Sequence, residues 1–190
     1  MKKILAIMVL GLLLSLNAKA ENISDFQIEG MSIGESALKY FSESEIKKNA
    51  YKTQKKSNFT QVTIKNKFNE FERIAFNYLD DDNEYKFHAI SGRINFKNNI
   101  NECLIQMDEI ISQVNAIFKE QKKVKKKKKK YRGDKTGKSK ITLVNFQIDD
   151  GGLIHVACYD FSKKMKWPDG LNVSIGSKEW NEFQKKKAFK

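Results

Sequence analysis

The longest hydrophobic pattern in the chain predicts one amphipathic helix over residues 99 to about 123. Its apolar residues recur at alternating spacings of four and three, which places them on one helical face. Asn99 stands at the N-cap position, and Glu102 completes a capping-box pair that would satisfy amides of the first turn. The apolar face consists of Ile100, Leu104, Met107, Ile111, Val114 and Phe118, widened by Cys103, Ile110 and Ile117. We expect the rest of the chain to pack around this helix.

Alternating apolar segments on both sides of this helix predict strands. Three lie before it, at residues 59–65, 71–79 and 85–97, and three after it, at 140–148, 153–161 and 171–175. Residues 149–152, Asp-Asp-Gly-Gly, are typical of a hairpin turn. Shorter elements are expected at residues 26–28 (strand), 36–41, 42–48 and 178–187 (helices).

This order of elements indicates an α+β fold, with a predominantly antiparallel sheet packed against one long helix. Three strands and a helix occur twice along the chain, which suggests two similar halves, although no residue-level repeat accompanies them. A single domain over residues 21–190 is long enough to bury a core without special cross-links.

The first 20 residues match a cleaved signal peptide. Lys2 and Lys3 form the charged region, an apolar stretch follows, and Ala18-Lys19-Ala20 is a small-x-small cleavage site. The apolar stretch is too short for a membrane span of about twenty residues, so no membrane span is expected after its removal. We expect a protein exported to the periplasm.

The strongly basic composition comes from one lysine-rich, low-complexity segment. Removing the signal peptide lowers the formal net charge from +13 to +10, and residues 122–140 alone carry +11. The segment reads either as a flexible, solvated loop or as a binding site for lipopolysaccharide, anionic lipid or nucleic acid. The candidate anion-binding residues are Lys122, Lys123, Lys125, Lys126, Lys127, Lys128, Lys129, Lys130 and Arg132.

Cys103 and Cys158 are the only cysteines in a chain addressed to an oxidising compartment, so we expect a disulfide between them. The bond would join the first turn of the long helix to the strand after the hairpin. Two buried free thiols are the alternative. A reactive cysteine is disfavoured because no CxxC spacing exists.

No catalytic or metal-binding motif stands out, and neither a cofactor nor a metal is expected. His88 and His155 lie in predicted strands, where a structural role is favoured. Asp149 and Asp150 near His155 fit a turn better than an acid–base set. The acidic residues at 80, 82 and 84 start like a calcium loop but lack its later glycine and glutamate.

Residues 28–38, IEGMSIGESAL, followed by Tyr40-Phe41, resemble a family of uncharacterised small exported bacterial proteins. The segments 88–92, 101–103 and 158–160 extend this resemblance over most of the chain. It implies no activity. Residues 30–97 are more distantly similar to BamE (SmpA)-type envelope proteins, which combine a Gly-Met-Ser/Thr turn with a three-stranded antiparallel sheet. The lipid-anchor cysteine is missing, so the resemblance does not imply an outer-membrane assembly role.

The sequence therefore favours a periplasmic, non-enzymatic interaction or envelope-associated protein with an unknown protein or envelope partner. An anion-binding module acting through the lysine-rich segment is the first alternative. An enzyme with a site assembled from scattered side chains is the second, and a cavity lined by His88 or His155 would favour it.

Overall fold

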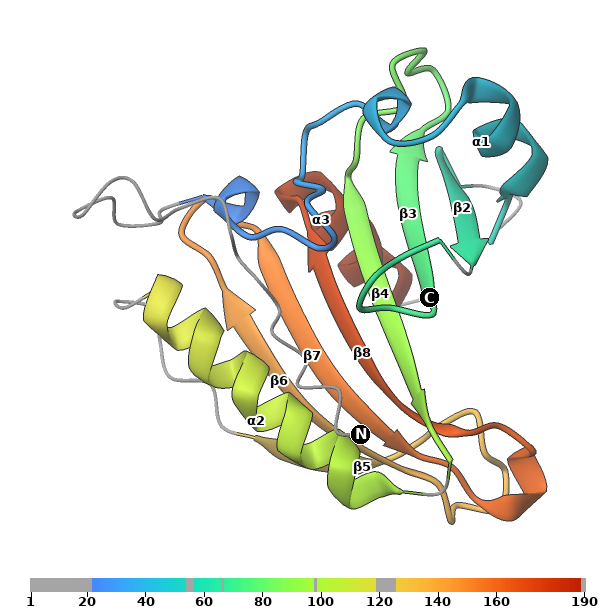
Figure 1. The fold of residues 1–190 in the computed structure, drawn as a ribbon, viewed down its shortest axis with the longest axis vertical. Coiled ribbons are helices and arrows are strands. Elements are labelled where there is room, and N and C mark those ends of the chain that lie inside the picture. The colour runs from blue at the N-terminus through green and yellow to red at the C-terminus, as the bar shows by residue number, and fades with distance from the viewer. Residues whose placement is uncertain (1–21, 54–56, 66, 98, 119–125, 189–190) are drawn as a thin grey trace.

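One antiparallel sheet forms the centre of the molecule. The structure, a computed structural model, describes residues 22–53, 57–65, 67–97, 99–118 and 126–188. Eight strands follow the spatial order β1-β2-β3-β4-β8-β7-β6-β5 (Figure 1). They are β1 (Ala50–Tyr51), β2 (Phe59–Lys65), β3 (Arg73–Leu79), β4 (Ala89–Phe96), β5 (Lys127–Lys130), β6 (Lys140–Gln147), β7 (Leu153–Asp160) and β8 (Asp169–Gly176). Together with three α-helices, this antiparallel sheet confirms the predicted α+β class.

Three α-helices and three short 3-10 turns complete the chain. The helices are α1 (Glu43–Asn49), α2 (Ile100–Ile117) and α3 (Lys178–Ala188), and the turns are η1 (Ile23–Asp25), η2 (Ala37–Lys39) and η3 (Lys163–Met165). Helix α2 packs on β7 and β8, while α1 packs on β2. Residues 22–41 cover the part of the same face that α2 leaves open (Figure 1).

The core lies between one face of the sheet and these covering segments. Successive strand residues point to opposite faces, so Ile90 and Ile94 of β4 lie on this face beside Ile175 and Leu171 of β8. All four are buried, as are the inward residues of α2. On the other half of the sheet the Phe41 ring stacks on Phe76 (centroids 5.6 Å apart), so the N-terminal segment extends the core.

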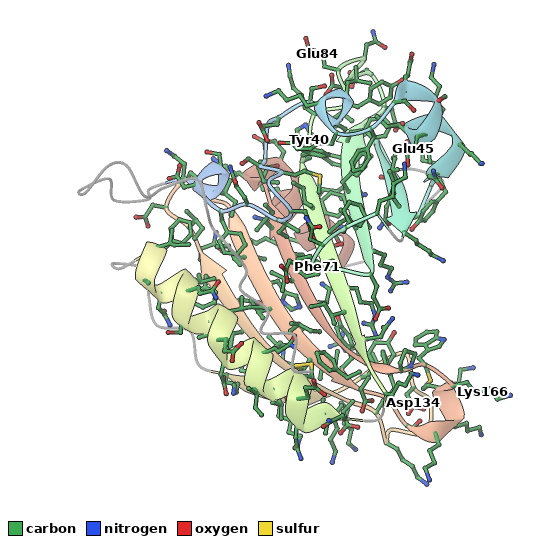
Figure 2. All side chains as sticks on the ribbon, in the orientation of Figure 1. Tyr40, Glu45, Phe71, Glu84, Asp134 and Lys166 are labelled. Atoms are coloured by element: carbon green, nitrogen blue, oxygen red, sulfur yellow. A yellow bond between two sulfur atoms is a disulfide. The ribbon has the colours of Figure 1, made fainter. Side chains whose placement is uncertain are left out.

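Gly92 is required where a loop folds over the core face. The Phe71 ring lies directly on Gly92, and a Cβ added there would collide with it. Figure 2 labels Phe71 beside the sheet. The Glu29 carboxylate accepts hydrogen bonds from the backbone N–H groups of residues 69, 70 and 71, which holds this loop in place. The glycine therefore makes room for an aromatic ring that fills the core.

Helix α2 starts where the sequence predicts but is shorter. The Asn99 Oδ1 atom accepts from the Glu102 backbone N–H (3.2 Å), and its Nδ2 donates to Glu102 Oε2 (3.0 Å), so the predicted cap is confirmed. The prediction that the helix runs to about residue 123 is wrong. It ends at Ile117, and Phe118 takes non-helical dihedrals of φ −107° and ψ 68°. The apolar stripe stops at the buried Phe118, so packing gives no reason to continue.

The two cysteines lie at disulfide distance. Their Sγ atoms are 2.05 Å apart and both residues are fully buried. Cys103 is in the first turn of α2, and Cys158 is in β7 opposite Leu171 of β8. The predicted pairing therefore joins the helix to the sheet within the core.

The two predicted halves form one continuous sheet but differ in where their helices pack. Strands β2-β3-β4 followed by α2 repeat the order β6-β7-β8 followed by α3, and β4 pairs with β8 along eight residues. If a two-fold axis related the two halves, it would run perpendicular to the sheet between the antiparallel neighbours β4 and β8. Such an axis would place α2 and α3 on the same face of the sheet. Instead α3 lies on the face opposite α2, where Trp180 meets Gly176 (Figure 1).

The lysine-rich segment is not simply a loop. Residues Lys127–Lys130 form the edge strand β5 and pair with Lys140 to Leu143 of β6. Successive lysines of the strand point to opposite faces of the sheet, which separates their charges. Backbone pairing therefore outweighs the like-charge repulsion on which the loop prediction rests. The predicted signal peptide and Lys122, Lys123 and Lys125 lie outside the described residues. In the described part of the chain, no helix is long and apolar enough to cross a bilayer.

Candidate functional site

The sheet face opposite α2, here called the open face, carries polar side chains at its centre. On β4, Ser91 and Arg93 lie on this face beside Ser174 and Asn172 of β8. All four are half-buried. Helix α3 covers the open face only at the end near Gly176, so the polar positions of the central strands stay partly accessible.

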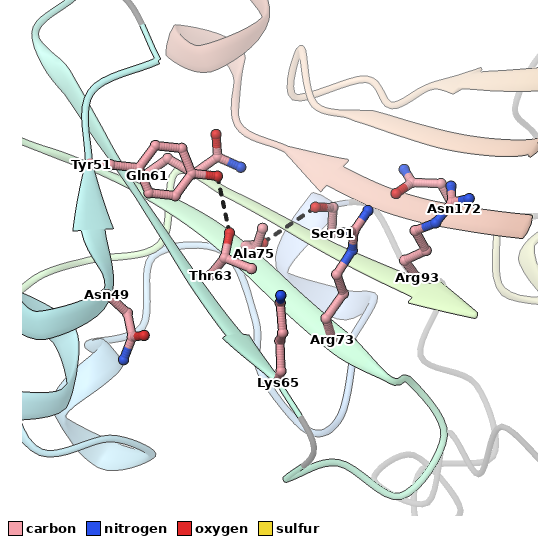
Figure 3. A pocket seen from close by; sticks show the side chains of 10 residues that line it. All are labelled: Asn49, Tyr51, Gln61, Thr63, Lys65, Arg73, Ala75, Ser91, Arg93 and Asn172. Carbon is pink, nitrogen blue, oxygen red and sulfur yellow. Dashed lines mark hydrogen bonds between the residues drawn. The ribbon is translucent and has the colours of Figure 1, made fainter. Parts of the chain in front are cut away.

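A cavity of about 580 Å³ lies on the open face over β2, β3 and β4 (Figure 3). We call it the cationic pocket because Lys65, Arg73 and Arg93 line it. None of the described residues that line it carries a carboxylate. Its other lining residues are Asn49, Tyr51, Gln61, Thr63, Ala75, Ser91 and Asn172. The positive charge of this pocket is therefore not neutralised by its own walls.

Arg93 is the fixed cation of this pocket. Its Nε donates to Asn95 Oδ1 (2.9 Å) and one Nη donates to the Pro168 carbonyl (3.1 Å). The guanidinium lies 5.6 Å from the centroid of the Tyr159 ring and 5.7 Å from that of Phe161, within reach of cation–π attraction. Burial, and secondly the charge of Arg73, lower the pKa of Arg93, which stays cationic at neutral pH.

Arg73 and Lys65 are the exposed cations of the pocket. They are register partners on β3 and β2, so their side chains share the open face. Neither side chain forms a hydrogen bond or ion pair with another described residue in the structure, in contrast to the side chain of Arg93. Beside them, the Tyr51 hydroxyl and Thr63 Oγ1 lie 3.1 Å apart. The two cations are therefore available for an external anion.

A second cavity, of about 600 Å³, adjoins the first on the open face. Gln61, Ser91 and Asn172 line both cavities, so the two are neighbours that share these residues. We call the second one the amide pocket, because six carboxamide side chains line it. They are Gln61, Asn77, Gln147, Asn172, Asn181 and Gln184. Helix α3 forms one wall with Trp180, Asn181, Gln184 and Lys185.

Asn77 is the unusual group in the amide pocket. It lies on β3 opposite Ala89, on the open face, and is only 6% exposed. Its Nδ2 is buried and has no hydrogen-bond partner among the described residues. Buried side-chain amides without a partner are rare because losing water without a replacement is unfavourable. Asn181 and Gln147, by contrast, donate to backbone carbonyls of residues 151, 152 and 176.

His155 also lines the amide pocket, whereas His88 does not. The His155 Nδ1 lies 2.6 Å from Asn145 Oδ1, which fixes the ring. Burial, and secondly the charge of Lys129, lower the pKa of His155, so the neutral imidazole is favoured at neutral pH. His88 packs edge-on against the Phe59 ring instead. The cavity thus meets the condition for the enzyme alternative with one histidine, but none of its described lining residues is an acid, so a scattered enzyme site stays a prediction.

The described lysines of the predicted anion site are split between the two faces. Lys127 and Lys129 are register partners of Leu143 and Ile141, which lie on the open face. Lys128 and Lys130 point to the other side. Lys126 is in an ion pair with Asp108 of α2 (2.6 Å), and Arg132 is exposed in the following turn. The structure therefore separates a set of residues that the sequence suggests could act together.

The other acidic candidates have structural contacts. Asp150 accepts from the backbone N–H groups of Ile23 (2.7 Å) and Gly152 (2.6 Å), as a turn residue does. Asp82 accepts from the N–H groups of Glu84 and Lys86. Among the described residues, no group of three or more His, Cys, Asp or Glu side chains is arranged to hold a metal ion.

No protein-family model, curated protein or solved structure matches this chain. The resemblances noted from the sequence stay predictions, and the chemistry of the site has to follow from its own residues. Cations in a cavity whose described lining residues include no carboxylate, beside neutral amides and hydroxyls, can bind an oxygen-rich anion.

Sequence reasoning missed this site although a signal was present. In Leu-Asn-Val-Ser-Ile, residues 171–175, polar residues occupy every second position, as in a strand with one polar face. Asn and Ser at those positions, rather than Lys and Glu, distinguish this face from an ordinary solvated one. Arg73 meets Arg93 through the pairing of β3 with β4, and Arg93 meets Asn172 through the pairing of β4 with β8. The second pairing joins strands far apart in the sequence, which no local pattern indicates.

Proposed function

We propose that this protein is a non-enzymatic binding module that takes an anionic ligand on its open sheet face. The observation that carries the proposal is the cationic pocket, where Lys65, Arg73 and Arg93 meet without a carboxylate among the described lining residues. Surface cations usually have acidic neighbours that neutralise them. Glu72 acts electrostatically on Arg93 but does not line the cavity, so three cations around one cavity still favour an acidic ligand.

The two arginines suit carboxylate, phosphate or sulfate groups better than lysines alone would. A guanidinium is planar and can donate two parallel hydrogen bonds to one oxyanion. Arg93 is held by Asn95 and Pro168, so little side-chain entropy remains to be lost on binding. Arg73 is exposed and free to adjust to the ligand.

Strand β5 adds lysines to the same proposed anion-binding face. Lys127 and Lys129 share the open face with the two pockets, whereas Lys128 and Lys130 do not. Exposed lysines at the far edge of the same face would attract a long anion and speed its association, an effect that salt weakens. This is the specific form in which anion binding by the lysine-rich segment fits the fold.

Export to the periplasm is part of the proposal. The signal peptide expected at residues 1–20 is its main support. The anionic ligand would then belong to an unknown partner in the cell envelope. The buried cysteine pair at disulfide distance is compatible with an oxidising compartment.

Binding of inorganic polyphosphate by purified variants tests the proposal. Arg73→Gln and Lys65→Gln should each weaken binding about tenfold, because each removes a charge-assisted hydrogen bond. Lys164→Gln is the control, since it removes an exposed lysine of η3 that lines neither cavity. Affinities would be measured by calorimetry at two salt concentrations.

Paired lysine variants separate the two faces of β5. Lys127→Gln with Lys129→Gln should slow association and reduce the salt dependence of polyphosphate binding. Lys128→Gln with Lys130→Gln changes the net charge equally on the other side and should have a smaller effect. Equal effects of both pairs, or binding that Arg73→Gln leaves unchanged, would contradict a ligand site on the open face.

A further inference from the structure

We infer that the anionic ligand is an acidic oligosaccharide, with a hydroxyl-rich sugar ring in the amide pocket and its charged group in the cationic pocket. This inference rests on the proposed function and specifies its ligand. It starts from a different observation, the buried amide of Asn77.

The Asn77 amide needs an oxygen acceptor that the described residues do not supply. Its Nδ2 is buried in the wall of the amide pocket and has no partner there. An amide in this position costs stability in the free protein unless something else makes the bond. Rotation of this side chain toward the cavity would let a ligand oxygen satisfy it. The free protein therefore lacks one hydrogen bond that a bound ligand could supply, at some cost to its stability.

The other polar groups of the amide pocket are mainly uncharged and of two kinds. Carboxamides such as Gln61 and Asn172 both donate and accept, and so does the Ser174 hydroxyl. A sugar hydroxyl likewise donates one hydrogen bond and accepts others. Neighbouring hydroxyls on a sugar ring thus match this lining, whereas a bare phosphate offers only acceptors. Lys185 is the one side chain among the described lining residues that carries a full charge at neutral pH.

The shared lining of the two neighbouring cavities places both within reach of one extended ligand. Gln61, Ser91 and Asn172 form their common wall. Volumes of about 580 and 600 Å³ are each within the usual range for small-ligand pockets, so each has room for a sugar unit. A saccharide that bears carboxylate or sulfate groups would place its ring against the amides and its charge against Arg73.

The centre of the open face lacks the free aromatic rings that read a nucleic acid by base stacking, since Arg93 already lies against the ring of Tyr159 on this face. Sheet surfaces that bind single-stranded RNA use aromatic side chains on their central strands. Here the corresponding positions on β4 and β8 are Ser91, Arg93, Asn172 and Ser174. Trp180 packs edge-on against Phe59, with ring centroids 5.1 Å apart, so it already has an aromatic partner. The polar centre favours a saccharide.

Three probes test the inference with the full mature protein. A galacturonate hexamer and a heparin hexasaccharide carry carboxylates and sulfates on sugar rings, while polyphosphate carries charge without a sugar. Asn77→Leu should weaken binding of an acidic hexasaccharide about tenfold and leave polyphosphate binding nearly unchanged. Ser174→Ala should weaken the same saccharide to a smaller extent. Asn115→Leu is the control, since Asn115 is exposed on α2.

Thermal stability supplies a second readout. Asn77→Leu is similar in volume and removes a buried donor without a partner, so the free protein should melt at the same or a higher temperature. Lower stability would mean that the amide already has a structural partner, and it would overturn the inference. So would equal effects on saccharide and polyphosphate binding.

The outcomes distinguish the two proposals. If polyphosphate binds through Arg73 but neither saccharide binds more tightly than polyphosphate, only the saccharide inference fails. If none of the three probes binds, the proposed function fails with it. Binding of the heparin hexasaccharide alone would mean that carboxylates on sugar rings do not suffice, and equal binding of both hexasaccharides supports the shared acidic-sugar chemistry.

Discussion

At the scale of single residues, Asp134 organises the turn between β5 and β6. Its Oδ1 accepts from the backbone N–H and hydroxyl of Thr136 (2.8 and 2.7 Å). Its Oδ2 accepts from the N–H and hydroxyl of Ser139 and from the Ser162 hydroxyl (3.0, 2.6 and 2.8 Å). The carboxylate thus ties this turn, labelled in Figure 2, to the segment after β7. These hydrogen bonds hold the pKa of Asp134 well below its ordinary value.

This environment predicts an acid-dependent loss of stability. Because the pKa of Asp134 is lower in the folded than in the unfolded chain, its contribution is complete above the ordinary pKa of 3.8. It is lost progressively as pH falls below that value. Asp134→Asn should lower the melting temperature at neutral pH and flatten its decline below pH ~4. Melting curves across this range measure both effects, with the exposed Asp81→Asn as control. A decline as steep as in the unmodified protein would contradict this role.

The sequence indicates the roles of Asp134 and Asn77 only in part. Asp134 appears as the one acid in a basic segment, and its hydrogen bonds depend on Ser162, which is distant in the sequence. Asn77 can be placed on the polar side of β3 by alternation. It lines the amide pocket together with residues of α3, and no local pattern predicts that this helix covers the open face.

At the scale of elements, the sequence predicts strongly periodic segments well and the lysine-rich segment poorly. The strands β2, β6 and β7 and the start of α2 follow from alternation, a Gly-Gly turn and a cap. Strand β5 was missed because a run of lysines has no apolar alternation. Lysines nevertheless suit an exposed edge strand, where they discourage pairing with other chains. The contact that fixes β5 is its ladder with β6.

The link between α2 and β7 gives a prediction at the same scale. Cys103 and Cys158 are separated by 55 residues, and a bond closing such a loop contributes about 4 kcal/mol in the chain-entropy model. Replacing both cysteines by serine should lower the free energy of unfolding in urea by this amount, and reductant should act similarly. Reductant should leave the double variant unchanged, which is the control. An unmodified protein that reductant does not destabilise would exclude a stabilising bond.

At the scale of the whole molecule, the pairing of β4 with β8 makes one sheet of two meanders. Their ladder runs from Ala89 and Gly176 to Phe96 and Asp169, and Ile90, Ile94, Leu171 and Ile175 line the core beside it. Aromatic contacts also cross the junction, since Trp180 of α3 packs on Phe59 of β2. The similar order of elements in the two halves therefore does not make them independent units.

This continuity predicts that both meanders unfold together. Amide hydrogen exchange should be slowest in β4, β8 and β7 and faster in the edge strands β1 and β5, because the central strands have paired neighbours on both sides. Unfolding in urea should give one transition by far-UV circular dichroism and by tryptophan fluorescence. Both tryptophans, Trp167 and Trp180, belong to the second half, so fluorescence reports on it while circular dichroism reports on the whole sheet. Two separated transitions would mean that one half unfolds while the other stays folded, so the β4–β8 ladder and the open-face site that spans it would be lost in the first transition.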